Sequence, residues 1–242
     1  EGYEVIDQRD LEVRYLYRPA TADVRGVNVT TVANLKVGYV MGIGDSVPQG
    51  LQQLGAQVTL LGERELASAD LSQFDTIMTG TRAYAVREDL KTYNSRLLDY
   101  VKNGGTVIVQ YNKFEFNEAQ YGPYPGKVGR ERVTDENAEM KVLDPGHPVF
   151  NGPNKIGRAD WANWVQERGL YFFDEQGRDP NYKDLIEFTE PFAYNQGTKR
   201  GALVEAKVGQ GRWLYIGLGL WRQLPAGTDG AYRLMANLLS LK

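Results

Sequence analysis

The stretch LLDYVKNGGTVIVQYN, residues 97–112, decides the fold of this chain. Leu97, Leu98 and Val101 fall on one helical face, and the glycine pair that follows suits a helix end because glycine adopts left-handed backbone without strain. The next run, TVIVQ, lacks the alternation of a half-buried strand, which indicates a strand covered on both faces. The stretch therefore predicts a helix, a tight turn and a central strand of a parallel sheet, which ends at Tyr111.

Earlier segments repeat this order of elements. Apolar runs at residues 37–41, 58–61 and 75–80 predict strands, and a helix should follow the first of them, with Asp45 and Ser46 as candidate caps and Pro48 in its first turn. A second helix is expected over residues 87–103, and a last one in GAYRLMANLLSL, residues 230–241. Strands and helices in alternation predict an α/β fold, with an open parallel sheet and helices on both of its faces.

Two parts of the chain depart from this order. Residues 1–34 are interpreted as an N-terminal strand extension or linker from an upstream domain, with strands predicted at 11–20 and 24–32, and residues 35–242 as the α/β domain. Residues 112–169, rich in glycine, proline and aromatic side chains, predict a long insertion. Strands at GALVEAKVG and RWLYIGLGL, joined by a hairpin turn at Gln210 and Gly211, then return the chain to the sheet.

Composition argues against several classes of function. The chain has 242 residues, of which 42% are hydrophobic, so a sizeable core is expected, and no tract is apolar enough to span a bilayer. A net charge of −3 with interspersed signs argues against nucleic-acid binding. There is no cysteine and one histidine, His147, so neither a disulfide nor a metal or other cofactor is expected in this chain. Because residue 1 is Glu rather than Met, we expect a processed chain or a piece of a longer one.

The glycine pair followed by five residues resembles the class I glutamine amidotransferase superfamily, a flavodoxin-like fold. In that superfamily a sharp elbow carrying the catalytic cysteine comes next, and here the position holds Tyr111. A glutaminase needs a thiolate activated by histidine, whereas tyrosine ionises near ~10. His147 lies in the loop DPGHPVF, well before the last strand, so no glutamine hydrolysis is expected. The ThuA-like branch, which also lacks the cysteine and often has His-Pro in a similar loop, is the nearer resemblance.

A second resemblance covers nearly the whole chain. The strings LKVGYVMGIGD, GTRAYAVREDL, YGPYP, RVTDENA, WVQERGLYF and RQLPAGTDGAYRLMANLL are similar to the C-terminal domain of large bacterial PIG-L (LmbE-like) deacetylases. This resemblance implies a zinc-dependent module for N-acetylated sugars and β domains upstream as partners, in a periplasmic or secreted protein. The zinc signature of that module, His-Pro-Asp-Asp, is not here, because His147 and Pro148 continue to Val149 and Phe150. Zinc is therefore expected only in the absent module.

Open parallel sheets bind ligands beyond the carboxyl ends of their strands. That rule selects candidate ligand-binding residues on the sheet rim, to which the insertion could add others. The rim candidates are Asp45, Arg82, Tyr84, Gln110, Tyr111, Asn112, Trp221 and Arg222, and those of the insertion are Arg132, Glu136, Gln166, Glu167 and Arg168. Aromatic faces combined with planar hydrogen-bonding groups suit a sugar, so a glycan is the expected ligand.

Structural interpretations stand beside these. Tyr111 could be a packed aromatic, and the string Gln166, Glu167 and Arg168 could form a buried ion pair that holds the insertion in place. The loop GIGDS lacks the spacing of a phosphate-binding loop.

Three classes of function remain. We favour a non-catalytic accessory domain of a PIG-L-type deacetylase that binds glycan or partner domains. The second class is a sugar-modifying hydrolase in which Tyr111, Glu136 or Glu167 acts. The third is a structural or oligomerisation module, which should expose apolar surface on the N-terminal strands.

Overall fold

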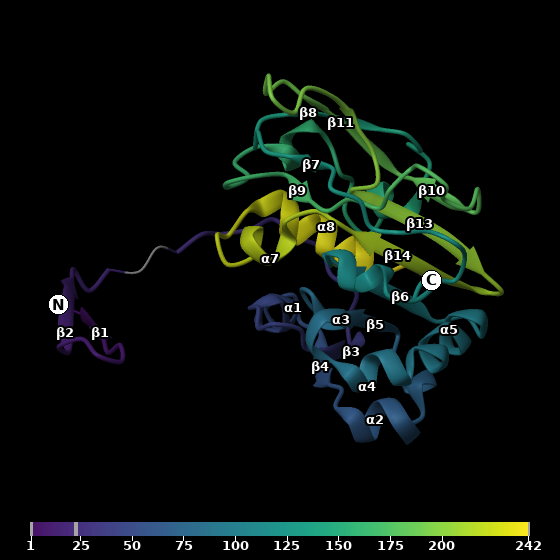
Figure 1. The fold of residues 1–242 in the computed structure, drawn as a ribbon. Coiled ribbons are helices and arrows are strands. Elements are labelled where there is room, and N and C mark those ends of the chain that lie inside the picture. Colours follow the sequence, from purple (N-terminus) through teal and green to yellow (C-terminus); the bar gives the residue numbers. More distant parts are fainter. Residues whose placement is uncertain (1, 22–23, 242) are drawn as a thin grey trace.

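The computed structural model describes residues 2–21 and 24–241, and at its centre lies a seven-stranded sheet (Figure 1). The sheet has the order β10-β13-β14-β6-β5-β3-β4, in which the five strands from β14 to β4 are parallel and β13 and β10 form an antiparallel edge. The strands are β3 (Lys36–Val40), β4 (Gln57–Leu60), β5 (Thr76–Thr79), β6 (Thr106–Gln110), β10 (Tyr182–Asp184), β13 (Leu203–Val208) and β14 (Gly211–Ile216). The predicted open, mostly parallel α/β sheet is confirmed.

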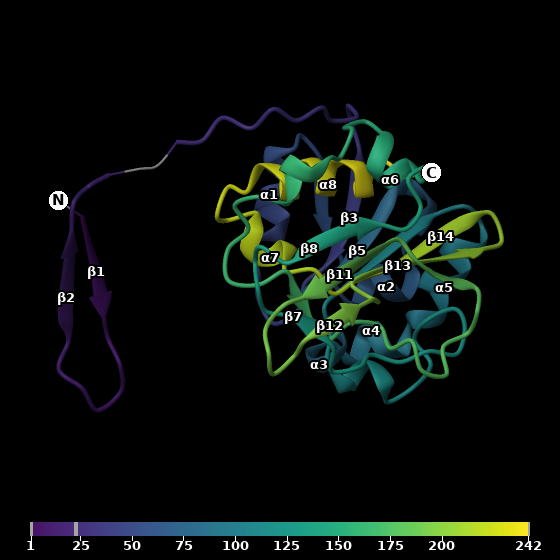
Figure 2. The ribbon, with the colours of Figure 1, turned by 90° about the horizontal axis from the view of Figure 1, so that it is seen from above.

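Helices cover both faces of the sheet. One face packs against α1 (Val47–Gln53) and α8 (Asp229–Leu239), and the other against α2 (Glu63–Ser68), α4 (Glu88–Thr92) and α5 (Asn94–Lys102) (Figures 1 and 2). Strand β6 contributes Ile108 to the first core and Val107 and Val109 to the second. Its lack of alternation therefore reflects burial on both sides, as predicted.

The turn at the glycine pair is also as predicted. Helix α5 ends at Lys102, and Gly104 has a φ of 105°, in the region that favours glycine. Gly105 is required for a different reason, because a Cβ there would lie 2.2 Å from Cζ of Tyr100. That ring packs across the turn and donates a hydrogen bond to the carbonyl of Phe74, at 3.0 Å.

The prediction of a single helix over residues 87–103 is wrong. The chain forms α3 (Ala83–Val86), α4 and α5, with a break between the last two at Tyr93. Directly after the break, Asn94 is buried, accepting a hydrogen bond from the Tyr84 hydroxyl at 2.7 Å and donating one to the carbonyl of Tyr121 at 3.0 Å. These two bonds anchor the start of α5 to the core in a direction that a continuous helix would not take.

The N-terminal residues form a hairpin, β1 (Gly2–Ile6) and β2 (Arg14–Arg18), that lies apart from the rest of the chain (Figures 1 and 2). The strand predicted within residues 24–32 is wrong, because the described part of that segment contains no strand. Instead of a neighbouring strand, the side chain of Asn154 pairs with the backbone of Thr30, both as acceptor and as donor, at 2.8 Å. Val27 and Val29 pack against the core.

Between β6 and β13 the chain builds small sheets above α8 and α7 (Leu220–Gln223) in the view of Figure 1. One sheet has the order β12-β11-β8, and another pairs β7 with β9. The elements here are η2 (Phe114–Asn117), β7 (Arg132–Val133), β8 (Glu139–Val142), α6 (Pro148–Asn151), η3 (Arg158–Trp161), β9 (Gly169–Leu170), β11 (Ile186–Glu190) and β12 (Gly197–Lys199). Among the described residues, no helix has the length and hydropathy needed to cross a membrane.

Candidate functional site

Strands β5, β6 and β14 end side by side, so the loops after them meet at the carboxyl edge of the sheet. Thr79 pairs with Val109, and Gln110 with Ile216. The loops after β5 and β6 are joined by a hydrogen bond of 2.7 Å from the N–H of Arg82 to the carbonyl of Tyr111. This edge is where an open parallel sheet binds its ligand.

Tyr111 lies under other aromatic side chains at this edge. Its ring stacks on Trp221, with centroids 4.8 Å apart and planes inclined at 23°, and meets Tyr171 edge-on at 5.7 Å. Only 6% of Tyr111 is exposed. Burial raises the pKa of Tyr111, an effect that the nearby Arg82 charge opposes only in part. The hydroxyl therefore stays protonated at neutral pH, which is unsuited to a nucleophile.

The sharp elbow expected at Tyr111 is absent, and the left-handed backbone lies at Arg82. Arg82 has a φ of 50°, whereas Tyr111 is not among the described residues with positive φ. The loop after β3 presses against this turn, since a Cβ on Gly42 would lie 1.9 Å from the carbonyl oxygen of Thr81. Gly42, the first glycine of the GIGDS string, thus allows two loops to approach closely. This close approach accounts for the glycine, and no role in phosphate binding is needed to explain it. Left-handed backbone at a non-glycine residue is strained and is concentrated at functional sites.

Two ion pairs flank the aromatic rings. Nε of Arg82 lies 2.8 Å from Oε1 of Glu115, and Arg222 pairs with Glu167. Burial alone would raise the pKa of Glu115, but hydrogen bonds from Arg82 and from the N–H of Lys113 lower it below its usual value. The hydrogen bond with Glu115 likewise raises the pKa of Arg82. Both members of the first pair are therefore charged at neutral pH.

Four residues expected on the rim instead lie below it, where hydrogen bonds hold their side chains. Both oxygens of Asp45 accept hydrogen bonds, from the Tyr39 hydroxyl at 2.7 Å and from the N–H groups of Val47 and Thr81. The other three are buried in hydrogen-bonded positions: Tyr84, Gln110 and Asn112. Arg82, Tyr111, Trp221 and Arg222 are the rim candidates that the structure brings together.

The candidates from the insertion are dispersed. Glu167 reaches the rim through its pair with Arg222, whereas the neighbouring Gln166 is exposed with a φ of 67°. Arg132 is exposed on β7, and Glu136 lines a cavity of about 490 Å³ beside Phe192. Arg168 is buried elsewhere, so the ion pair that holds the insertion in place runs from Glu167 to α7 and does not involve Arg168.

His147 has no part in this site. Its Nδ1 accepts a hydrogen bond from the N–H of Val149 at 3.2 Å, and its Nε2 lies 3.1 Å from Oε1 of Glu205, although the ring is poorly aligned for a hydrogen bond to that oxygen. Glu205 also pairs with Arg212 at 2.6 Å. The histidine therefore belongs to a buried charge cluster on one face of the sheet.

Sequence reasoning missed several residues that complete the rim. Phe114 meets Tyr171 edge-on at 5.7 Å, and Lys113 and Arg130 lie over the rings of Tyr171 and Phe114, at 5.2 and 5.3 Å. Glu115 was missed as well. The proximity of residues 113–115 to the end of β6 was a usable signal, but nothing local marks Tyr171, which reaches the rim with a φ of 52°.

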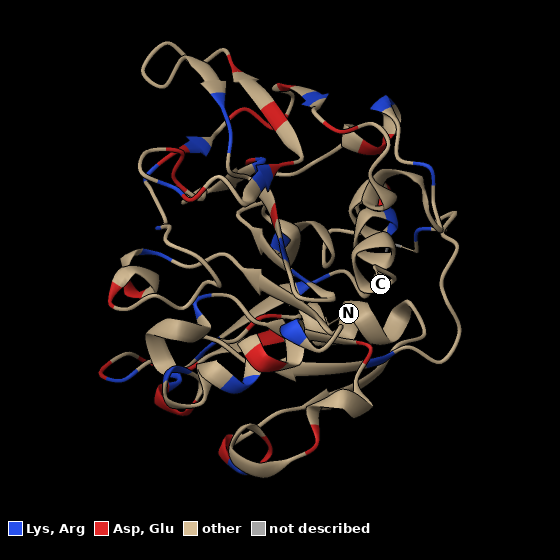
Figure 3. Ribbon diagram, turned by 90° about the vertical axis from the view of Figure 1, so that its right-hand side faces the viewer, with Lys and Arg blue, Asp and Glu red and all other residues tan. Residues whose placement is uncertain are grey.

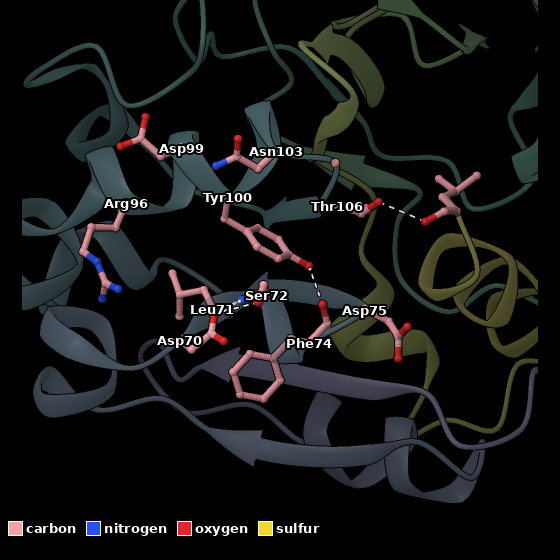
Figure 4. A pocket seen from close by; sticks show the side chains of 13 residues that line it. Asp70, Leu71, Ser72, Phe74, Asp75, Arg96, Asp99, Tyr100, Asn103 and Thr106 are labelled. Atoms are coloured by element: carbon pink, nitrogen blue, oxygen red, sulfur yellow. Dashed lines mark hydrogen bonds between the residues drawn. The ribbon is translucent and has the colours of Figure 1, made fainter.

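A cavity of about 500 Å³ lies at the opposite, amino edge of the sheet (Figure 4). Asp70, Asp75 and Asp99 line it with Arg96 and Tyr100, next to the first residues of β5 and β6. Among the described residues, no group of three or more acidic, histidine or cysteine side chains is placed to hold a metal ion. Basic and acidic residues are interspersed along the ribbon (Figure 3).

Comparisons with known proteins agree with this architecture. No protein-family model and no curated protein matches the sequence. Among solved structures, a cytoplasmic protein of Salmonella typhimurium is 16% identical, with a TM-score of 0.53 over 85% of this chain and 98% of its own. A ThuA-like protein from Bacteroides uniformis is 12% identical, with a TM-score of 0.50 over 88% of this chain and 93% of its own.

A β-galactosidase from Rahnella sp. R3 is 14% identical, with a TM-score of 0.51, and the match covers 88% of this chain but 32% of the enzyme. At these identities the likeness establishes the fold alone. The chain has the α/β fold, with a mostly parallel central sheet, of the class I glutamine amidotransferase-like and ThuA-like structures.

Proposed function

We propose that this chain is a non-catalytic, amidotransferase-like domain that binds a carbohydrate at the rim around Tyr111 and Trp221. The observation that carries the proposal is the cluster of four aromatic rings at the carboxyl edge of the sheet, flanked by two ion pairs. The rings are Tyr111, Phe114, Tyr171 and Trp221, and the pairs are Arg82 with Glu115 and Arg222 with Glu167.

This combination matches the chemistry of a sugar. The C–H groups of a pyranose pack on aromatic faces, while its hydroxyls need both donors and acceptors. Phe114 is 42% exposed, and Trp221 and Tyr171 are half-buried, so ring surface is accessible. The guanidinium groups of Arg82 and Arg222 supply donors, and the carboxylates of Glu115 and Glu167 supply acceptors.

Two further considerations support a binding role within a larger protein. Tyr111 is shielded by Trp221 and lacks a neighbouring histidine, since the one histidine of the chain contacts Glu205. The fold also occurs as about a third of the Rahnella β-galactosidase and of an exo-β-1,4-mannosidase from an Opitutaceae bacterium, which matches with a TM-score of 0.51 at 13% identity. The sequence resemblance to PIG-L deacetylases adds N-acetylated sugars as the ligand class and a zinc-bearing module as the partner.

The test is a titration of N-acetylglucosamine oligomers, followed by calorimetry and by the indole N–H signals in NMR. Saturable binding is expected, and Trp221→Ala should weaken it by about tenfold, which corresponds to the ~1.4 kcal/mol expected of one stacked ring. Tyr194→Ala is the control, because Tyr194 is 93% exposed in the loop between β11 and β12. If no glycan binds, or if both variants bind as tightly as the parent chain, the proposal fails.

A second candidate, a structural module that docks onto a neighbouring domain, is favoured by the N-terminal hairpin. Tyr3, Val5, Tyr15 and Tyr17 lie on one face of it, and all are exposed. Such a face should make the isolated chain self-associate through the hydrophobic effect. A monodisperse monomer in light scattering would count against this candidate, and deletion of residues 1–20 should restore a monomer if it is correct.

A further inference from the structure

Arg168 is a buried cation among aromatic rings. It is 3% exposed, and among the described residues no carboxylate lies within ion-pair distance of its guanidinium. Its Nη1 and Nη2 donate to the carbonyls of Trp161 and Ala138, at 2.5 and 3.2 Å. Three rings surround it, those of Trp161, Trp164 and Phe188, with centroids 5.5 to 5.9 Å away.

Burial without an ion pair has a measurable consequence for this group. Burial lowers the pKa of Arg168 to about 10, and the more distant charges of Asp135 and Glu136 offset the effect only in part. Carbonyl oxygens and ring faces compensate a buried cation incompletely, because neither carries a full negative charge.

Two buried N–H donors at this place have no hydrogen-bond partner. They are Nε of Arg168 and the indole Nε1 of Trp161. Buried donors are almost always paired, so two orphans on neighbouring side chains are unusual. Both residues line the same cavity, of about 710 Å³.

The rest of the cavity lies between β8 and η3. Met140, Val142 and Ile156 form apolar walls, while Arg158 and Glu139 are exposed lining residues of opposite charge. The cavity thus combines apolar walls with polar lining, and its one buried cation, Arg168, has no ion pair among the described residues.

We propose that this cavity is a binding site for a small carboxylate with an apolar or ring-shaped body, held by Arg168 and the indole N–H of Trp161. A carboxylate presents two oxygens to the fork of an arginine, and its single negative charge balances the single positive charge of Arg168. Arg168, Arg158 and Glu139 together give the lining a net charge of +1, which a carboxylate balances and a phosphate dianion exceeds. The site is separate from the proposed glycan site, because the lining of this cavity includes none of the rim residues around Tyr111 and Trp221.

Benzoate is the probe, and neutral benzamide, of nearly the same shape, is its control. Titrated into the full chain and followed by NMR, benzoate should bind saturably and shift the Trp161 indole N–H, whereas benzamide should bind at least ~10-fold more weakly, as expected for the loss of a charge-assisted contact. Arg168→Met should weaken benzoate binding by a similar factor. Absence of saturable benzoate binding, or equal affinity for benzamide, would overturn the proposal.

Further variants keep the proposal testable if Arg168→Met fails to fold. Trp161→Phe keeps a ring beside Arg168 but removes the orphan N–H, so it should weaken benzoate binding without abolishing it. Glu139→Gln removes a negative charge from the cavity lining and should strengthen binding. Unchanged affinity in Trp161→Phe together with weaker binding in Glu139→Gln would contradict the assignment, and N-acetylglucosamine binding at the rim should be unaffected in every case.

Discussion

Trp221 lies face to face over Tyr111, with ring centroids 4.8 Å apart, so a residue of α7 covers the residue that follows β6. The two residues are brought together because β6 and β14 are parallel neighbours that end at the same edge. The stack gives that edge an aromatic surface flanked by two ion pairs.

Tyr111→Phe should change neither stability nor glycan affinity appreciably. Within the described part of the chain, the Tyr111 hydroxyl forms no hydrogen bond, and phenylalanine retains the ring that makes the stacking contacts. The expected change in the free energy of unfolding is therefore within ~0.5 kcal/mol. Thermal denaturation and a titration of N-acetylglucosamine oligomers measure both. Loss of turnover of a sugar substrate in this variant would instead establish Tyr111 as a chemically active residue.

Gly105→Ala should destabilise the fold. The added Cβ would lie 2.2 Å from the Tyr100 ring, which is held by its bond to Phe74, so relief requires a shift of packed groups costing about 1–3 kcal/mol. Denaturant unfolding checks this. Gly26→Ala is the matched control, because nothing lies within 4 Å of a Cβ at that position, and an equal loss there would refute the steric explanation.

Asp45→Ala should cost about 2–3 kcal/mol of stability, because it leaves three donors without their acceptor, on the Tyr39 hydroxyl and the N–H groups of Val47 and Thr81. Asp45→Asn retains one acceptor oxygen and should lose less. Chemical denaturation of both variants gives the order. A role of Asp45 in ligand contact rather than in fastening would reverse the expectation, with normal stability and weakened glycan binding.

Stability should fall in acid through Glu205. Burial alone would raise the pKa of Glu205, but its contacts with His147 and Arg212 lower it below the ordinary 4.5. A lowered folded-state pKa means that the stabilisation is present above about pH 4.5 and is lost as the pH falls through the folded-state value.

Glu205→Gln should therefore be less stable than the parent chain by about 3 kcal/mol at neutral pH, since Arg212 loses a buried partner. The difference should shrink as the pH falls below 4.5 and disappear below the lower folded-state pKa of Glu205, where the parent carboxylate is itself protonated. Urea unfolding as a function of pH follows both chains. A difference that does not depend on pH would show that the cluster acts through packing and not through charge.

Some of this fold could be predicted from local sequence, because its signals lie within one element. The glycine pair at 104 and 105, the unalternating TVIVQ strand and the apolar face of α8 each reflect the period or the backbone freedom of a short segment. The prediction failed where hydrogen bonds to residues far away in the sequence override the local pattern. The helix breaks at Tyr93 because the next residue, Asn94, forms hydrogen bonds with Tyr84 and Tyr121. The backbone of Thr30 bonds to the side chain of Asn154 and not to a neighbouring strand.

The sequence by itself determined that the chain is an α/β sheet protein in which a glycine pair precedes a buried strand and Tyr111 follows it, since these features depend on the order of residues along one segment. Only the tertiary structure decided that Trp221 covers Tyr111, that the left-handed turn falls at Arg82, and that three aromatic rings enclose Arg168. These relationships join residues far apart in the chain. They depend on how the loops close over the sheet edge, and no periodicity or local propensity encodes that closure.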